Sequence, residues 1–74
     1  MLVYPNPTNG MITIDLSESQ CFEFMVYDLL GQNLMSGQSQ HGSTQIDLTS
    51  CHQGIYFVAV SWNGNRMIQK VIVR

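Results

Sequence analysis

The fold of this chain is decided by residues 55–64, IYFVAVSWNG, which join the most apolar stretch of the sequence to a tight-turn dipeptide. Residues 55–62 favour an extended strand, because β-branched and aromatic residues predominate. One face of this strand carries large apolar side chains: Tyr56, Val58, Val60 and Trp62. Asn63-Gly64 then predicts a type I′ turn, in which both central residues take positive φ. The sequence therefore predicts a β-hairpin whose second strand covers residues 66–74.

Two-residue alternation also predicts strands before this hairpin. They are expected over residues 2–4, 11–16, 22–28, 32–35 and 45–48. Their inward faces carry the apolar side chains Ile12, Ile14, Leu16, Phe22, Phe24, Val26, Ile46 and Leu48. Residues 17–20 are expected to form a polar connection, and residues 37–43, the most polar stretch, the loosest part of the chain.

Turn signals separate most of the predicted strands. Asp28 begins a predicted type I turn in which its side chain accepts backbone hydrogen bonds and Gly31 takes a positive φ. No segment shows the 3.6-residue period of a helix. Short strands at spacings of about ten residues, each followed by a turn signal, indicate an all-β protein built as a two-sheet antiparallel sandwich.

Composition narrows the possible functions. The chain has 74 residues, enough for one domain, and 11% of them are charged, compared with about 25% in an average globular domain. A formal net charge of −2 provides no basic surface for nucleic acid or anionic membranes. No apolar run reaches the ~18 residues of a membrane-spanning helix. No signal peptide opens the chain, so it is either cytosolic or a piece of a longer precursor with its targeting signal upstream.

Few residues offer catalytic or metal-binding chemistry. Cys21 and Cys51 permit either one disulfide or two separate small apolar side chains. His52 follows Cys51, but adjacent side chains on an extended chain point to opposite sides, which argues against a catalytic pair. These three residues and His41 lack the paired spacing of zinc ligands. The carboxylates are too dispersed for a calcium loop: Asp15, Glu18, Glu23, Asp28 and Asp47. We expect no enzyme activity, no metal and no cofactor.

Residues 4–10, YPNPTNG, form a rigid opening turn, because Pro5 and Pro7 fix φ and restrict the residues before them. This turn and several later motifs resemble the C-terminal sorting domains of the type IX secretion system (type A, the Por secretion system C-terminal domain). The matching residues run along the whole chain: Tyr4, Pro5, Asn6, Pro7, Gly10, Tyr27, Asp28, Gly31, Asp47, Leu48, Gly54, Tyr56, Asn63, Gly64 and the tail Lys70–Arg74. Cys51 and His52 depart from the family pattern, which has a small apolar and a Pro- or Ala-like residue there.

The resemblance implies a small seven-stranded antiparallel immunoglobulin-like β-sandwich without catalytic activity. It implies that residues 1–74 are a single C-terminal sorting domain excised from a larger secreted precursor with an upstream cargo. Such a domain crosses the periplasm, directs its cargo through the outer-membrane translocon and is then cleaved off by a sortase-like protease. The cargo ends at the cell surface or is secreted. The expected partners are the cargo, the translocon and sortase-like components, with no nucleic acid and no membrane insertion.

The tail has two interpretations that one strand can combine. Its residues Lys70, Val71, Ile72, Val73 and Arg74 form either a docking tip for the translocon, bound by strand addition, or the closing strand of the sandwich. Bare edge strands also allow two copies of the chain to pair. The alternative function is an extracellular immunoglobulin-like binding or spacer module that contacts carbohydrate or protein through Tyr4, Tyr27 or Trp62. Phe22, Phe24, Tyr56 and Trp62 are expected mainly in the core, whereas Tyr4 and Tyr27 lie on faces or ends that can stay exposed.

Overall fold

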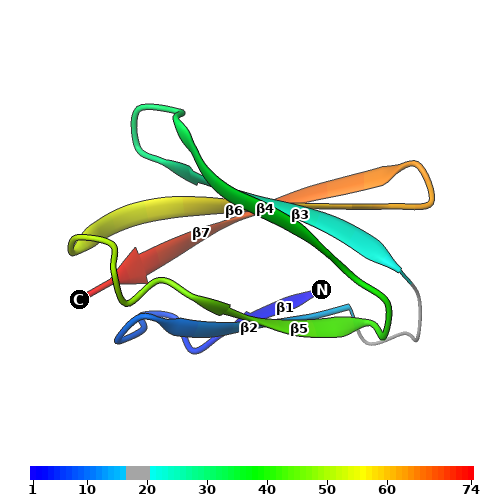
Figure 1. Ribbon diagram of the computed structural model, residues 1–74, viewed down its shortest axis with the longest axis horizontal. Helices are drawn as coiled ribbons and strands as arrows, with labels where there is room; N and C mark the ends of the chain where they lie inside the picture. Colours follow the sequence, from blue (N-terminus) through cyan, green and yellow to red (C-terminus); the bar gives the residue numbers. More distant parts are fainter. Residues whose placement is uncertain (17–20) are drawn as a thin grey trace.

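Seven strands make up the computed structural model, which describes residues 1–16 and 21–74. They are β1 (Leu2–Tyr4), β2 (Met11–Asp15), β3 (Phe22–Asp28), β4 (Asn33–Ser39), β5 (Ser43–Asp47), β6 (Gly54–Trp62) and β7 (Asn65–Val73). Two antiparallel sheets, with strand orders β1-β2-β5 and β4-β3-β6-β7, face each other (Figure 1). The predicted all-β antiparallel sandwich is confirmed. The described residues contain no helix long and apolar enough to cross a membrane.

The strand order is that of an immunoglobulin-like sandwich with one strand moved. In the constant-type arrangement, strands one, two, five and four share a sheet, and strands three, six and seven form the other. Here β4 pairs with β3 instead of β5, so that the second sheet has four strands. As a consequence, β4 and β7 are the two edges of the larger sheet.

The core lies between the sheets and is formed by the inward faces that the alternation predicts. Its buried apolar side chains are Ile12, Ile14, Leu16, Phe22, Val26, Ile46, Leu48, Tyr56, Val58, Val60, Val71 and Val73. Phe24 and Trp62 are partly buried and pack against this cluster. Strand boundaries differ from the predicted ones mostly by one or two residues, and the predicted polar connection at residues 17–20 lies outside the described residues.

Both predicted turns are confirmed. Asn63 and Gly64 have φ values of 46° and 77°, as a type I′ turn requires. In the turn after β3, Asp28 Oδ1 accepts hydrogen bonds from the backbone N–H groups of Leu30 and Gln32, both at 2.9 Å. The N–H of Gly31 donates to the Asp28 carbonyl at 3.0 Å, and Gly31 has a φ of 88°.

The prediction for residues 32–43 is wrong in one respect. The strand expected over residues 32–35 continues to Ser39, and β5 begins at Ser43, so the stretch expected to be loosest belongs largely to paired strands. Gly37 lies opposite Phe24, whose ring covers it; a Cβ atom on Gly37 would lie 2.7 Å from Phe24 Cζ. Ser39 is buried, and its hydroxyl donates to the carbonyl of Ser43 at 2.7 Å. Polar residues of this stretch therefore belong to paired strands, where a loop was expected.

Candidate functional site

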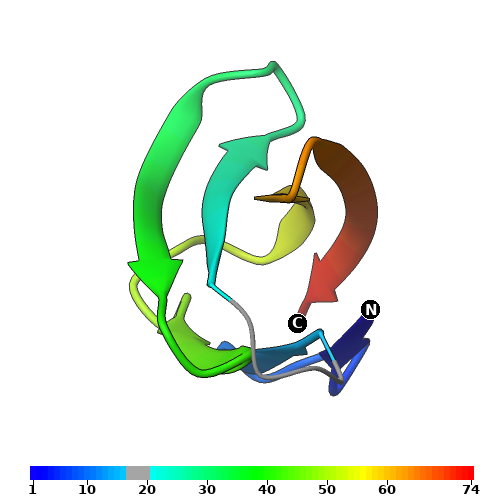
Figure 2. The same ribbon diagram turned by 90° about the vertical axis from the view of Figure 1, so that its right-hand side faces the viewer.

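The opening turn lies along the outer edge of β7, where the chain's first and last segments meet (Figure 2). The N–H of Thr8 donates to the carbonyl of Ile72 at 2.9 Å, and the N–H of Arg74 donates to the carbonyl of Thr8 at 3.0 Å. This is a parallel bridge between Thr8 and Val73. Thr8 thus acts as a one-residue extra strand at the end of the larger sheet.

The side chain of Asn6 continues this pairing. Its Nδ2 donates to the carbonyl of Lys70 at 2.8 Å, and its Oδ1 accepts from the N–H of Ile72 at 3.0 Å. The carboxamide offers one donor and one acceptor, as a backbone peptide group does. Asn6 and Thr8, which we call the clip, therefore cover the outward-facing polar groups of β7 from the Lys70 carbonyl to the Arg74 N–H.

The clip is also fixed to the smaller sheet. Thr8 is buried, and its Oγ1 accepts from the N–H of Gly10 at 3.0 Å and donates to the carbonyl of Met11 at 2.6 Å. Gly10 has a φ of 135°, and a Cβ atom there would lie 2.7 Å from Thr49 Cγ2. The Gly10 carbonyl accepts from the N–H of Leu48 at 2.7 Å. Glycine is required here for both reasons.

Side-chain alternation places the five tail residues on the two faces of the larger sheet. Val71 and Val73 are buried in the core, whereas Lys70, Ile72 and Arg74 are exposed on the outer face of the larger sheet. The clip holds the carbonyl of Lys70 and both backbone groups of Ile72, which point away from β6. The inward residues close the sandwich, and the outward ones form a row beside the opening turn.

The opening turn and the final strand, which pair in the structure, lie at the two ends of the segment that matches one sequence family. Residues 2–74 match the family of secretion system C-terminal sorting domains. The chain belongs to this family. Members are non-catalytic type IX sorting signals, so this sorting domain directs an attached cargo to the secretion machinery, for delivery to the cell surface or secretion.

The sorting domain is also similar to the ulvan lyase NLR42 of Nonlabens ulvanivorans, with 29% identity over 72 residues. The match covers 96% of this chain and 14% of the lyase. The sorting domain therefore spans a small part of the length of its relative.

The other family-motif residues of the sorting domain build turns and strand ends. Asp47 Oδ1 accepts hydrogen bonds from the side-chain hydroxyl and the backbone N–H of Thr49, and these bonds lower the pKa of Asp47 below its ordinary 3.8. The hydroxyl of Tyr56 donates to the His52 carbonyl at 2.6 Å, and burial raises the pKa of Tyr56 above 10.0. Gly54 begins β6 opposite Val73. These motifs shape the sandwich and do not converge on a reaction centre.

The cysteines and histidines all lie outside the strands. Cys21 is exposed and Cys51 is half-buried against the core, and both are free thiols. His41 and His52 are exposed. Among the described residues, no three or more His, Cys, Asp or Glu side chains are grouped closely enough to hold a metal ion.

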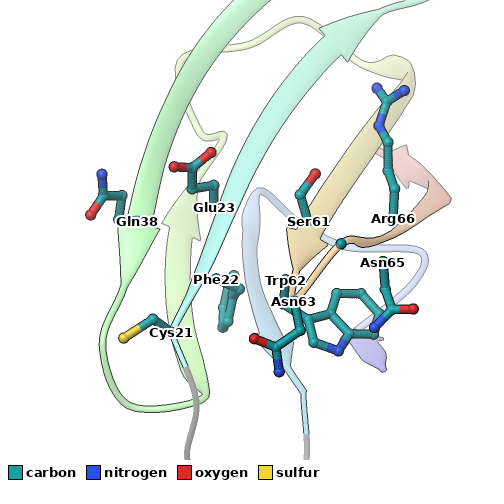
Figure 3. A pocket seen from close by; sticks show the side chains of 10 residues that line it. Cys21, Phe22, Glu23, Gln38, Ser61, Trp62, Asn63, Asn65 and Arg66 are labelled. Atoms are coloured by element: carbon teal, nitrogen blue, oxygen red, sulfur yellow. The ribbon is translucent and has the colours of Figure 1, made fainter.

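The aromatic candidates for a binding surface do not share one site. Tyr4 lies on β1, Tyr27 near the end of β3, and Trp62 at the end of β6. Trp62 lines a shallow groove of about 510 Å³ at the β6–β7 turn. Figure 3 shows its indole ring beside Asn65, whereas Glu23, Ser61 and Arg66 point the other way. Tyr4 and Tyr27 do not line this groove, so the three aromatic side chains do not form one binding platform.

Sequence reasoning missed two contributors to the site. Thr8 was not singled out, and Asn6 was assigned only to a rigid turn, although both contact the final strand. The sequence separation of 64 to 66 residues hides this pairing from local patterns. The one available signal was a pair of polar residues, Asn6 and Thr8, alternating with prolines that cannot donate hydrogen bonds.

Proposed function

We propose that the outward-facing tail residues Lys70, Ile72 and Arg74 are the surface that the type IX translocon reads. One observation carries the proposal: Val71 and Val73 anchor the strand in the core while the alternate residues remain exposed. The clip holds the backbone of these outward residues in an extended conformation. A rigid, preorganised strand loses little conformational entropy when a partner binds it.

The proposal includes the path of the precursor. Residues 1–74 form a single domain that follows a cargo, crosses the periplasm with it, and is removed by a sortase-like protease after translocation. Family membership and the small share of the lyase that this chain matches support a domain attached to a larger protein. The partners are then the cargo, the translocon and the sortase-like components.

The test is export of a periplasmic reporter fused ahead of residues 1–74 in a host that carries the system. Removing residues 70–74 is a poor test, because it also deletes the buried Val71 and Val73. The sharper variant is Ile72→Ser with Arg74→Ser, which changes only exposed side chains. We expect the reporter to reach the medium or cell surface with the native domain and to remain periplasmic with this variant.

The matched control is Leu34→Ser with Gln38→Ser on β4, the opposite edge of the same sheet. Leu34 and Ile72 have similar exposed fractions, 38% and 36%. The control should export like the native domain. Normal export of the Ile72→Ser/Arg74→Ser variant, with its fold verified by circular dichroism, would contradict a role of this row in recognition.

A further inference from the structure

All the cationic side chains of this protein lie on one face of one strand. The sequence contains three Lys and Arg residues in total, namely Arg66, Lys70 and Arg74, and they recur every fourth residue along and directly after β7. Alternation places them on the same face as Ile68 and Ile72. All five side chains are exposed, Ile68 to 58%. In the part of the chain that the structure describes, none of the three cations takes part in an ion pair.

The backbone of β7 is covered over only half of its outer edge. Bonds from the clip show that the polar groups of Lys70, Ile72 and Arg74 point away from β6. By the same alternation, the N–H and C=O groups of Arg66 and Ile68 and the N–H of Lys70 point outward too. Among the described residues, no backbone strand pairs with this segment, residues 66–70, which we call the free edge.

We propose that the free edge binds an extended acidic segment of a partner protein by strand addition. The partner strand pairs its backbone with Arg66 and Ile68, places an apolar side chain beside Ile68, and places carboxylates opposite Arg66 and Lys70. Opposite charges directly across two strands stabilise the pair. The inference rests on the proposed function, since this partner belongs to the export machinery, and it adds the chemistry of the segment that recognises the domain.

Charge complementarity favours this partner over a second copy of the chain. The longest two-fold antiparallel pairing of two free edges centres on Ile68. It places Arg66 of each copy opposite Lys70 of the other, and like charges directly across two strands are destabilising. An anionic lipid surface would satisfy the cations, but it has no regular row of amide donors and acceptors to pair with the backbone of the free edge.

The first experiment measures binding of the synthetic peptide TETVTET to the isotope-labelled 74-residue chain by NMR. We expect the largest shift changes at the amides of Arg66, Ile68 and Lys70. The matched peptide TQTVTQT should bind at least about fivefold more weakly, because it lacks the carboxylates. Equal affinities for the two peptides, or shift changes centred elsewhere, would overturn the proposal.

Charge variants of the domain supply the matched control. Arg66→Gln with Lys70→Gln lowers the net charge by two, and so does Asn33→Asp with Ser36→Glu on the exposed face of β4. We expect the first pair to weaken TETVTET binding by roughly fivefold or more and the second pair to have little effect. Equal weakening would show a non-specific charge effect. Binding to phosphatidylglycerol vesicles without peptide binding, or self-association through Ile68, would likewise overturn the acidic-strand assignment.

The export assay separates this inference from the proposed function. If the native residues 1–74 do not export the reporter, the proposed function fails, whatever the peptide result. If the native domain exports, the Ile72→Ser/Arg74→Ser variant does not, and the Arg66→Gln/Lys70→Gln variant exports as well as the native domain, recognition rests on Ile72 and Arg74 and the acidic partner is excluded. We expect the native domain to export and this variant to export several-fold less than the Asn33→Asp/Ser36→Glu control.

Discussion

Asn6 shows how one side chain can replace a strand residue. Its carboxamide meets a C=O and an N–H of β7, the two groups that a neighbouring backbone would pair. An aspartate could not do both, because an ionised carboxylate only accepts hydrogen bonds. Asn6 can therefore satisfy outward-facing backbone groups of β7 where no further strand pairs with it.

The clip predicts that alanine substitutions at two asparagines of the same turn differ in their effect on the stability of the domain. Asn6→Ala removes both bonds to β7 and should lower the free energy of unfolding by about 1–3 kcal/mol. Asn9→Ala, at an exposed position three residues away, should change it by less than about 0.5 kcal/mol. Urea denaturation checks both. Equal stabilities of the two variants would contradict the role of the clip.

The lowered pKa of Asp47 predicts in which direction the stability of the fold changes with pH. Its pKa is lower in the folded protein than its ordinary 3.8 because Thr49 donates to the carboxylate. The ionised form therefore stabilises the fold at pH values above 3.8, and this contribution is lost as the pH falls through the lowered pKa. The stability advantage of the native protein over Asp47→Asn should shrink as the pH falls below 3.8. An advantage that grows with acidity in urea titrations would refute this assignment.

At the scale of elements, the sequence predicted strands wherever alternation was strong, and failed where polar residues do the pairing. Residues 55–64 specify the β6–β7 hairpin completely, because apolar alternation and Asn63-Gly64 agree. β4 was predicted too short, because its second half pairs with β3 through Gly37 and Ser39, whose roles depend on Phe24 and Ser43. The clip was not predictable, since its partners lie at opposite ends of the sequence.

Two proline substitutions test which way the backbone of β7 faces. Proline removes an N–H, which an edge strand tolerates only where that group faces away from its neighbour. The N–H of Ile68 faces outward, whereas Gln69 pairs with Val58 of β6. Ile68→Pro should therefore be less destabilising than Gln69→Pro, by about 1–3 kcal/mol. Thermal unfolding measures the stability of both variants. If Ile68→Pro is the more destabilised of the two, the outward-facing backbone groups of β7 have been assigned to the wrong residues.

At the scale of the whole molecule, the clip connects both sheets. It bonds to β7 through Asn6 and Thr8 and reaches the end of β5 through Gly10. A domain of 74 residues has a small stability margin, on the order of 5 kcal/mol, so these bonds matter for the entire fold.

Two deletions isolate this contribution. Removing residues 1–3 takes away most of β1 and keeps the clip, whereas removing residues 1–9 takes away both. The longer deletion should abolish cooperative thermal unfolding, because it also exposes the edge beside the buried Val71 and Val73. The shorter one should keep a cooperative transition at lower temperature. Calorimetric traces of the same shape for both deletions would show that the clip is dispensable.

The position of the clip has a mechanical consequence. A load applied to the chain ahead of β1 acts on the short pairing of β1 with β2 and then on the bonds of Asn6 and Thr8 to β7, before it acts on the pairing of β7 with β6. Peeling the turn away would leave the hairpin paired along its full length while baring the edge from Lys70 to Arg74. Tension from a protein attached ahead of β1 would thus lengthen the strand edge that is open to a partner. The opening turn would cover this edge only while the tension is low.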